Sequence, residues 1–146
     1  MKVLLLHGKE SQPGGRKAQA IQSAGHELVN PDLRFDWDEA IQIAQRAFDL
    51  HNPDVVVGSS RGGAIAINID TRGAPRVLIA PAWNMFGSEN SVSSNTTILH
   101  CKEDRVVPYE DSVDIAARTG SKLICVGRSH RMSDSEALEA LVDQLG

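Results

Sequence analysis

The sequence predicts an α/β protein: a three-layer sandwich in which helices cover both faces of a parallel sheet of about six strands. Short apolar runs alternate with helical patterns along the whole chain. Most of these runs are apolar on both faces, as strands buried between two layers of helices are. The chain has 146 residues, enough for one domain with a real core, so residues 1–146 are expected to form a single domain.

Six segments carry the strand pattern, each a short apolar run bounded by polar, Gly or Pro residues. In chain order they are residues 3–6, 26–29, 55–57, 76–80, 97–100 and 122–126. The first run stops at His7 after four apolar residues, which is too short for a signal peptide, so it is interpreted as a buried strand.

Helical signals lie between the strands. Asp36 is a plausible N-cap with Glu39 three residues later, and Ser133 with Glu136 has the spacing of a capping box. Apolar residues at helical spacing follow each cap. Further helices are predicted for residues 14–24, 64–70 and 109–118.

The composition restricts the function classes. Hydrophobic residues make up 41% and charged residues 23%, as in an ordinary globular protein. The net charge of −4, without a basic cluster, argues against a nucleic-acid partner. No stretch is long enough to span a membrane. Cys101 and Cys125 end apolar runs and are expected to be buried free thiols, which fits a reducing cytoplasm.

The turn after the third strand is the most informative stretch. Gly58-x-Ser60-x-Gly62 has the spacing of a nucleophile elbow, in which a strained turn exposes a serine between a strand and a helix. Side chains two residues before and after the serine would collide, so glycine is expected at both places. A Gly-rich turn can also bind phosphate, but no lysine followed by Ser or Thr closes this one.

Other strand ends carry the groups that a nucleophilic serine needs. Asp104 follows the fifth strand and His130 follows the sixth; serine, acid, histidine is the chain order of one hydrolase fold. Glu103 is the nearest alternative acid. The loop His7-Gly8-Lys9 after the first strand is placed to offer a backbone N–H to an oxyanion.

In this order and spacing, residues 4–8, 58–63 and 104–108 and the histidine after the last strand resemble the α/β-hydrolase superfamily, more narrowly the small capless esterase-like serine hydrolases of bacteria. The resemblance covers nearly the whole chain. It implies the family's sheet without its first two strands, in the order 4-3-5-6-7-8, with Ser60, Asp104 and His130 after strands 5, 7 and 8. It leaves residues 81–95 as the only candidate lid.

The resemblance implies a carboxylesterase-like serine hydrolase. Ser60 would attack a small ester or thioester, His130 would act as the base and Asp104 would orient it. The backbone N–H groups of Lys9 and Arg61 would form the oxyanion hole. No cofactor or metal is expected. The expected partner is a small-molecule acyl substrate; neither a nucleic acid nor a membrane is expected, and the chain is expected to be a monomer or a homodimer. The alternative is an inactive binding protein on the same fold.

Several side chains have two interpretations. Trp83, Met85 and Phe86 either line an acyl pocket near Ser60 or cover the sheet as ordinary core. His7 and His100 each end a predicted strand and are expected to bond to loop backbone rather than to take part in catalysis. A second set of side chains either gathers at the mouth of the site to attract an anionic substrate or is solvated or ion-paired; these are Arg61, Arg128 and Arg131.

Overall fold

The computed structural model describes residues 1–146. Six strands and five helices alternate along most of the chain. The strands are β1 (Lys2–Leu6), β2 (Glu27–Val29), β3 (Val55–Ser59), β4 (Arg76–Ile79), β5 (Thr97–His100) and β6 (Lys122–Cys125). The helices are α1 (Arg16–Ser23), α2 (Trp37–His51), α3 (Arg61–Asn68), α4 (Tyr109–Thr119) and α5 (Ser135–Asp143).

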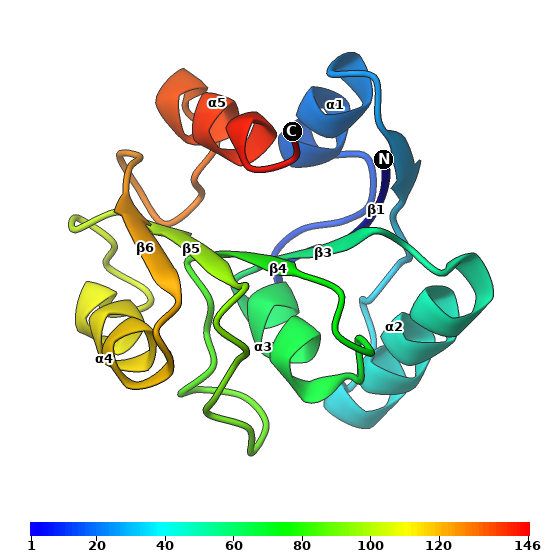
Figure 1. Cartoon of the computed structure of the whole chain (residues 1–146), viewed down its shortest axis with the longest axis horizontal. Helices are drawn as coiled ribbons and strands as arrows, with labels where there is room; N and C mark the ends of the chain where they lie inside the picture. The colour runs from blue at the N-terminus through cyan, green and yellow to red at the C-terminus, as the bar shows by residue number, and fades with distance from the viewer.

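The strands form one parallel sheet in the order β2-β1-β3-β4-β5-β6. Helices α1 and α5 lie on one face, and α2, α3 and α4 lie on the other (Figure 1). The predicted three-layer sandwich is therefore confirmed, and the strand order is the one that the resemblance implied. In such a sheet, ligands bind beyond the carboxyl ends of the strands.

Each face of the sheet has its own core. Ala18, Ile21 and Leu141 of α1 and α5 pack against one face, while Phe48 and Ile65 of α2 and α3 pack against the other. The central strand β3 is buried throughout. This explains the doubly apolar strands of the sequence, because both surfaces of the central strands are covered by helices.

One predicted cap is confirmed and another is wrong. Asp36 accepts a hydrogen bond from the amide of Glu39 at 2.9 Å, as the sequence predicts. Helix α5, however, is capped by Asp134, whose carboxylate accepts from the amide of Ala137 at 3.2 Å. The Ser133 hydroxyl instead donates to a backbone carbonyl two residues earlier. The Asp134 carboxylate also accepts the amide of Arg128 at 3.1 Å, so it joins the start of α5 to the loop after β6.

The two cysteines differ in burial. Both are free, and Cys101 is fully buried as predicted. Cys125 is exposed, which corrects the prediction, because it ends β6, the edge strand that has a neighbour on one side only. None of the helices is both long and apolar enough to cross a membrane.

Candidate active site

Ser60 lies at the turn between β3 and α3, in the strained conformation that the sequence predicts. Its backbone has φ 56° and ψ −116°, outside the regions that a serine normally occupies. A Cβ atom at Gly58 would overlap the carbonyl group of Gly62, and one at Gly62 would overlap the carbonyl oxygen of Leu6 in β1. The glycines are therefore required by close contacts between backbone segments.

Hydrogen bonds hold Ser60 in this conformation. Its N–H donates to the carbonyl of Ile79 in β4 at 2.9 Å. Its carbonyl accepts from the amides of Gly63, Ala64 and Ala82 at 2.9, 3.2 and 3.0 Å. A strained residue persists only where its surroundings determine its conformation, and here the neighbouring strand, helix and loop all contribute.

The structure brings Ser60, His130 and Asp104 together from three loops at one end of the sheet. Ser60 Oγ lies 2.9 Å from Nε2 of His130. Nδ1 of His130 lies 2.7 Å from Oδ2 of Asp104. Because an ionised carboxylate only accepts, the proton of a neutral His130 is on Nδ1 and the lone pair of Nε2 faces the serine hydroxyl. This arrangement suits a general base acting on Ser60.

The loop that carries His130 is fixed on several sides. The backbone at Gly127 has φ 96°, and a Cβ there would lie 2.5 Å from Sδ of the buried Met132. The ammonium of Lys17 in α1 donates to the carbonyl of Arg131 at 2.6 Å. Burial, together with the charge of Arg131, lowers the pKa of Lys17 to about 8. Lys17 of α1 and the close packing of Met132 against Gly127 thus fix the loop that carries the histidine.

Asp104 is the buried acid of the site. Its Oδ1 accepts the amides of Val106 and Val107, each at 2.8 Å. Burial alone raises the pKa of Asp104, but the hydrogen bonds from His130 and from these two amides outweigh that effect and the pKa is lowered. Glu103, the alternative acid, is exposed to solvent.

The two strand-end histidines differ from each other. His7 bonds to backbone as predicted: it lies 2.8 Å from the Gly8 carbonyl, and its Nε2 accepts the Leu33 amide at 2.9 Å. His100 has side-chain partners as well, which corrects the prediction. It is fully buried, and its Nε2 lies 2.9 Å from Oδ2 of Asp104, the oxygen that also faces His130. The sequence places His100 four residues before Asp104, but only the folded loop brings the two side chains together.

The loop after β1 lies against the elbow. A Cβ atom at Gly8 would be 3.4 Å from the Cβ of Ser60, so the loop backbone runs past the serine. The amide of Lys9 donates to no protein carbonyl. The amide of Arg61 is the first of α3 and has no carbonyl four residues earlier in the helix to bond. Both amides are thus available to a ligand.

The Arg61 side chain is turned away from the mouth of the site. Its guanidinium is buried and donates to the carbonyls of Leu33 and Phe35 at 3.0 and 2.8 Å. It also lies 5.9 Å from the ring centroids of Trp37 and Phe86. Arg61 therefore ties the loop before α2 to the elbow, which overturns the alternative that its charge faces a substrate.

The three candidate pocket residues lie in different surroundings. Trp83 belongs to the core and donates from Nε1 to the carbonyl of Asp111 in α4 at 3.1 Å. Phe86 stacks on Trp37 with ring centroids 5.9 Å apart. Met85 is 54% exposed. For Trp83 the structure favours the core alternative.

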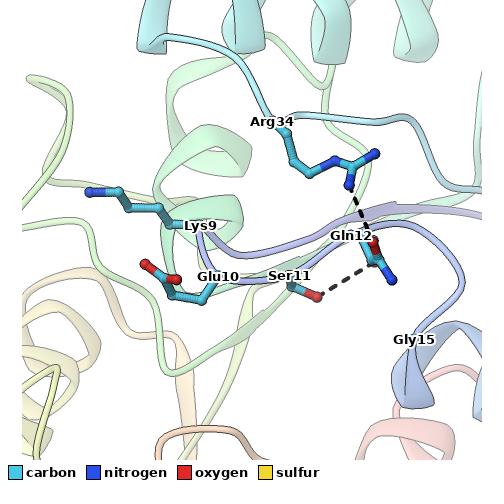
Figure 2. Close-up of a pocket in the computed structure, with 6 residues that line it drawn as sticks. All are labelled: Lys9, Glu10, Ser11, Gln12, Gly15 and Arg34. Carbon is cyan, nitrogen blue, oxygen red and sulfur yellow. Dashed lines mark hydrogen bonds between the residues drawn. The ribbon is translucent and has the colours of Figure 1, made fainter.

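A polar cavity of about 480 Å³ opens beside the loop after β1 (Figure 2). None of its lining residues is hydrophobic; they are Lys9, Glu10, Ser11, Gln12, Gly15 and Arg34. Arg34 is neutralised by Asp32 through two contacts of 2.9 Å, and these bonds lower the pKa of Asp32 to about 2. Arg34 also donates to Gln12, while the Lys9 side chain extends away from both.

Solved structures of hydrolases resemble the whole chain. A hydrolase of the α/β superfamily from Xanthomonas campestris is 23% identical, with a TM-score of 0.75 over 98% of this chain and 94% of that protein. The α/β hydrolase domain-containing protein 10 from mouse is 17% identical, with a TM-score of 0.70 over 99% and 87%. The esterase domain of a Rhodothermus marinus protein is 13% identical, with a TM-score of 0.72 over 99% and 84%.

No protein-family model and no curated protein sequence matches the chain. At these identities the structural similarity establishes the fold and leaves the activity to be argued from the site. The chain has the α/β-hydrolase fold, as the resemblance implied.

Proposed function

We propose that the protein is a serine hydrolase that cleaves a small ester or thioester through an acyl-enzyme, with Ser60 as nucleophile, His130 as general base and Asp104 as the orienting acid. The observation that carries this proposal is the pair of contacts from Ser60 Oγ to His130 Nε2 at 2.9 Å and from His130 Nδ1 to Asp104 Oδ2 at 2.7 Å. The neighbours' fold supports hydrolysis at this place in the sheet.

In the first step, Ser60 Oγ attacks the carbonyl carbon while His130 Nε2 accepts the hydroxyl proton. Asp104 holds the Nδ1–H tautomer of His130 and stabilises the imidazolium that forms. The imidazolium then returns its proton to the leaving alcohol or thiol, and the acyl group stays on Ser60. Water, activated by the same histidine, releases the acid and restores the serine.

The developing oxyanion would be bound by the amides of Arg61 and Lys9. The first belongs to the first turn of α3, where the helix dipole favours negative charge. The second lies in the loop that Gly8 holds against Ser60. Losing one oxyanion-hole donor typically costs roughly 10²- to 10³-fold in kcat.

We place the acyl group of the substrate in the polar cavity, because its lining includes Lys9, the proposed oxyanion donor, although neither Ser60 nor His130 lines it. An alkyl chain gains about 0.8 kcal/mol for each CH₂ group removed from water, provided that apolar side chains cover it. The cavity offers none. We therefore expect p-nitrophenyl acetate to be turned over at least as well, in kcat/KM, as the octanoate.

The first test is labelling of the native protein with a fluorophosphonate, followed by mass spectrometry. The reaction requires a nucleophilic serine, an activating base and an oxyanion hole together. We expect stoichiometric labelling of wild type and none of Ser60→Ala. Ser59→Ala is the matched control, because Ser59 precedes the nucleophile at the end of β3 and has no part in the mechanism.

The control variant should label like wild type. If folded wild type is not labelled, the serine hydrolase proposal is wrong and a binding function on this fold becomes the better interpretation. Label that persists in Ser60→Ala would show that another residue reacts with the probe.

A further inference from the structure

A second histidine shares the acid of the proposed triad. Oδ2 of Asp104 lies 2.7 Å from Nδ1 of His130 and 2.9 Å from Nε2 of His100. The Asp104 and His100 side chains are fully buried, so no water competes for these contacts. On the far side of the His100 ring, Nδ1 lies 2.6 Å from Oγ of the buried Ser112 in α4.

The partners of His100 determine where its proton lies. Nε2 faces Asp104 Oδ2 and the carbonyl of Val107 at 3.2 Å, and both of these groups only accept hydrogen bonds. Nε2 therefore carries the proton. Burial, the largest effect on this group, lowers the pKa of His100, so the ring is neutral and Nδ1 has a lone pair. The Ser112 hydroxyl then donates to Nδ1.

The result is a directed chain of hydrogen bonds. Ser112 donates to His100, and His100 donates to Asp104. On the other side, His130 donates to the same oxygen of Asp104 and accepts from Ser60. With the two amides on Oδ1, the carboxylate accepts from four donors, which fix the plane of the carboxyl group.

We propose that His100 is a positioning residue of the catalytic site: its Nε2–H, oriented by Ser112, holds Oδ2 of Asp104 in line with Nδ1 of His130. The proposal rests on the serine hydrolase function of Ser60. His100 makes no hydrogen bond to the nucleophile or to the base, and its hydrogen bond to Asp104 is the path by which it would act.

The position of His100 in the fold explains how it is able to orient the carboxyl group of Asp104. His100 ends β5 and Asp104 follows in the next loop, so the strand fixes the donor and the loop carries the acceptor. Without the donor, Oδ2 keeps one partner, so rotation of the carboxyl group about its bond to Cβ is restrained by three hydrogen bonds instead of four. A smaller fraction of molecules would then have His130 oriented toward Ser60, because the orientation of His130 depends on Asp104.

The test compares His100→Leu with His100→Gln. Leucine fills the site but has no donor, whereas the glutamine side-chain amide is able to donate to Asp104. The readout is the second-order rate constant for fluorophosphonate labelling of Ser60, measured per mole of folded protein. We expect His100→Leu to react about tenfold more slowly, the equivalent of one lost hydrogen bond, and His100→Gln to recover most of the rate.

A buried substitution elsewhere is the matched control for lost stability. Ile115→Ala removes a fully buried side chain of α4 that has no bond to the chain of polar groups. We expect it to lower Tm, as His100→Leu does, yet to label at the wild-type rate per folded molecule. A merely structural role of His100 predicts that both variants label at that rate.

A second readout does not depend on turnover. We expect the Nδ1 proton of His130 to give a low-field ¹H NMR signal, which is assigned by its loss in His130→Ala, because Asp104→Ala would also remove the acceptor of the His100 proton. We expect His100→Leu to shift or broaden this signal and His100→Gln to keep it near its wild-type position. If wild type is unlabelled, the proposed hydrolase function fails and this signal still decides the positioning of Asp104. Three results would overturn the proposal. The first is a His130 signal that is unchanged in His100→Leu. The others are a labelling rate of His100→Leu equal to that of Ile115→Ala, and labelling rates of His100→Leu and His100→Gln that are equally slow.

Discussion

Gly62 in the first turn of α3 lies directly against the carbonyl oxygen of Leu6 at the end of β1, so closely that any Cβ atom at position 62 would overlap it. This contact brings the loop after β1 beside the elbow. The loop that carries Lys9, the proposed oxyanion donor, therefore runs past Ser60, the proposed nucleophile. The elbow glycines are thus required by the close approach of the neighbouring strand as well as by the turn itself.

Gly62→Ala should destabilise the protein strongly. Both groups at the contact are backbone of buried elements, so neither is able to move aside, and we expect a loss of about 1–3 kcal/mol or more in the free energy of unfolding. Urea denaturation measures it. Gly15→Ala is the control: its φ is −73°, a Cβ there would meet nothing closer than 3.9 Å, and it should cost less than about 1 kcal/mol. Equal effects would contradict the close contact.

Asp104→Asn should lower kcat by roughly 10⁴-fold with little change in fold, because the amide group favours the wrong tautomer of His130. The neighbouring substitution Glu103→Gln changes an exposed acid outside the site and should leave kcat unchanged. Steady-state hydrolysis of p-nitrophenyl acetate measures both. A large loss in Glu103→Gln, with Asp104→Asn active, would reassign the acid.

Lys9→Ala should cost less than about tenfold in kcat, because the proposed oxyanion donor is the backbone N–H, which the variant keeps. The same ester assay measures the effect, with circular dichroism to check the fold. If Lys9→Ala abolished turnover in a folded protein, the assignment of the Lys9 amide would be wrong and its ammonium would be the active group.

Arg61→Leu should lower stability by about 1–3 kcal/mol or more. The change removes the buried donors to the carbonyls of Leu33 and Phe35 and leaves both groups without a partner. Thermal unfolding measures the loss. Arg128→Ala is the control, because that side chain is 77% exposed and contacts only Glu136 at 3.6 Å. A neutral Arg61→Leu would show that the guanidinium does not tie the loop before α2 to the elbow.

The stability of the protein should fall as the pH drops below the usual pKa of histidine, 6.5. Burial lowers the pKa of His100, against the opposing effect of Asp104, so the unfolded chain binds a proton that the folded protein does not. The contribution is fully present above pH 6.5 and is lost below it. A second loss follows at more acid pH, below the usual pKa of 3.8 of Asp104, because the pKa of this carboxyl is also lowered in the folded state.

Urea denaturation between pH 8 and pH 5 measures the first of these losses. His130 and Tyr109 also face His100, so the comparison needs a variant in which only His100 stops titrating. His100→Gln serves this purpose and should flatten the profile in that interval. An unchanged slope in the variant would assign the dependence to another histidine.

Much of the fold follows from local sequence. The six strands were predicted to within two residues at each end, since doubly apolar runs bounded by polar residues are typical of a covered parallel sheet. Asp36 was identified as a cap because its partner lies three residues away. The spacing of Gly58, Ser60 and Gly62 likewise depends on sterics within one turn.

Other features depend on segments far apart in the chain. The sequence placed Ser60, Asp104 and His130 at strand ends, but only the folded sheet brings their side chains within hydrogen-bond distance. It did not indicate that Arg61 turns toward the carbonyls of residues 33 and 35, or that Trp83 packs on α4. The direction of a long side chain is set by the cavities and acceptors around it, and distant segments build these.

The sequence by itself determined the layers, the strand positions and the strained serine turn, because each arises from the periodicity and sterics of a few adjacent residues. The tertiary structure alone decided that His100 shares Asp104 with His130, that Asp134 rather than Ser133 caps α5, and that Cys125 is exposed. These three features depend on which groups lie near one carboxylate oxygen, one helix end or one edge of the sheet. Segments far apart in the chain supply those groups, and they come together only when the sheet has assembled.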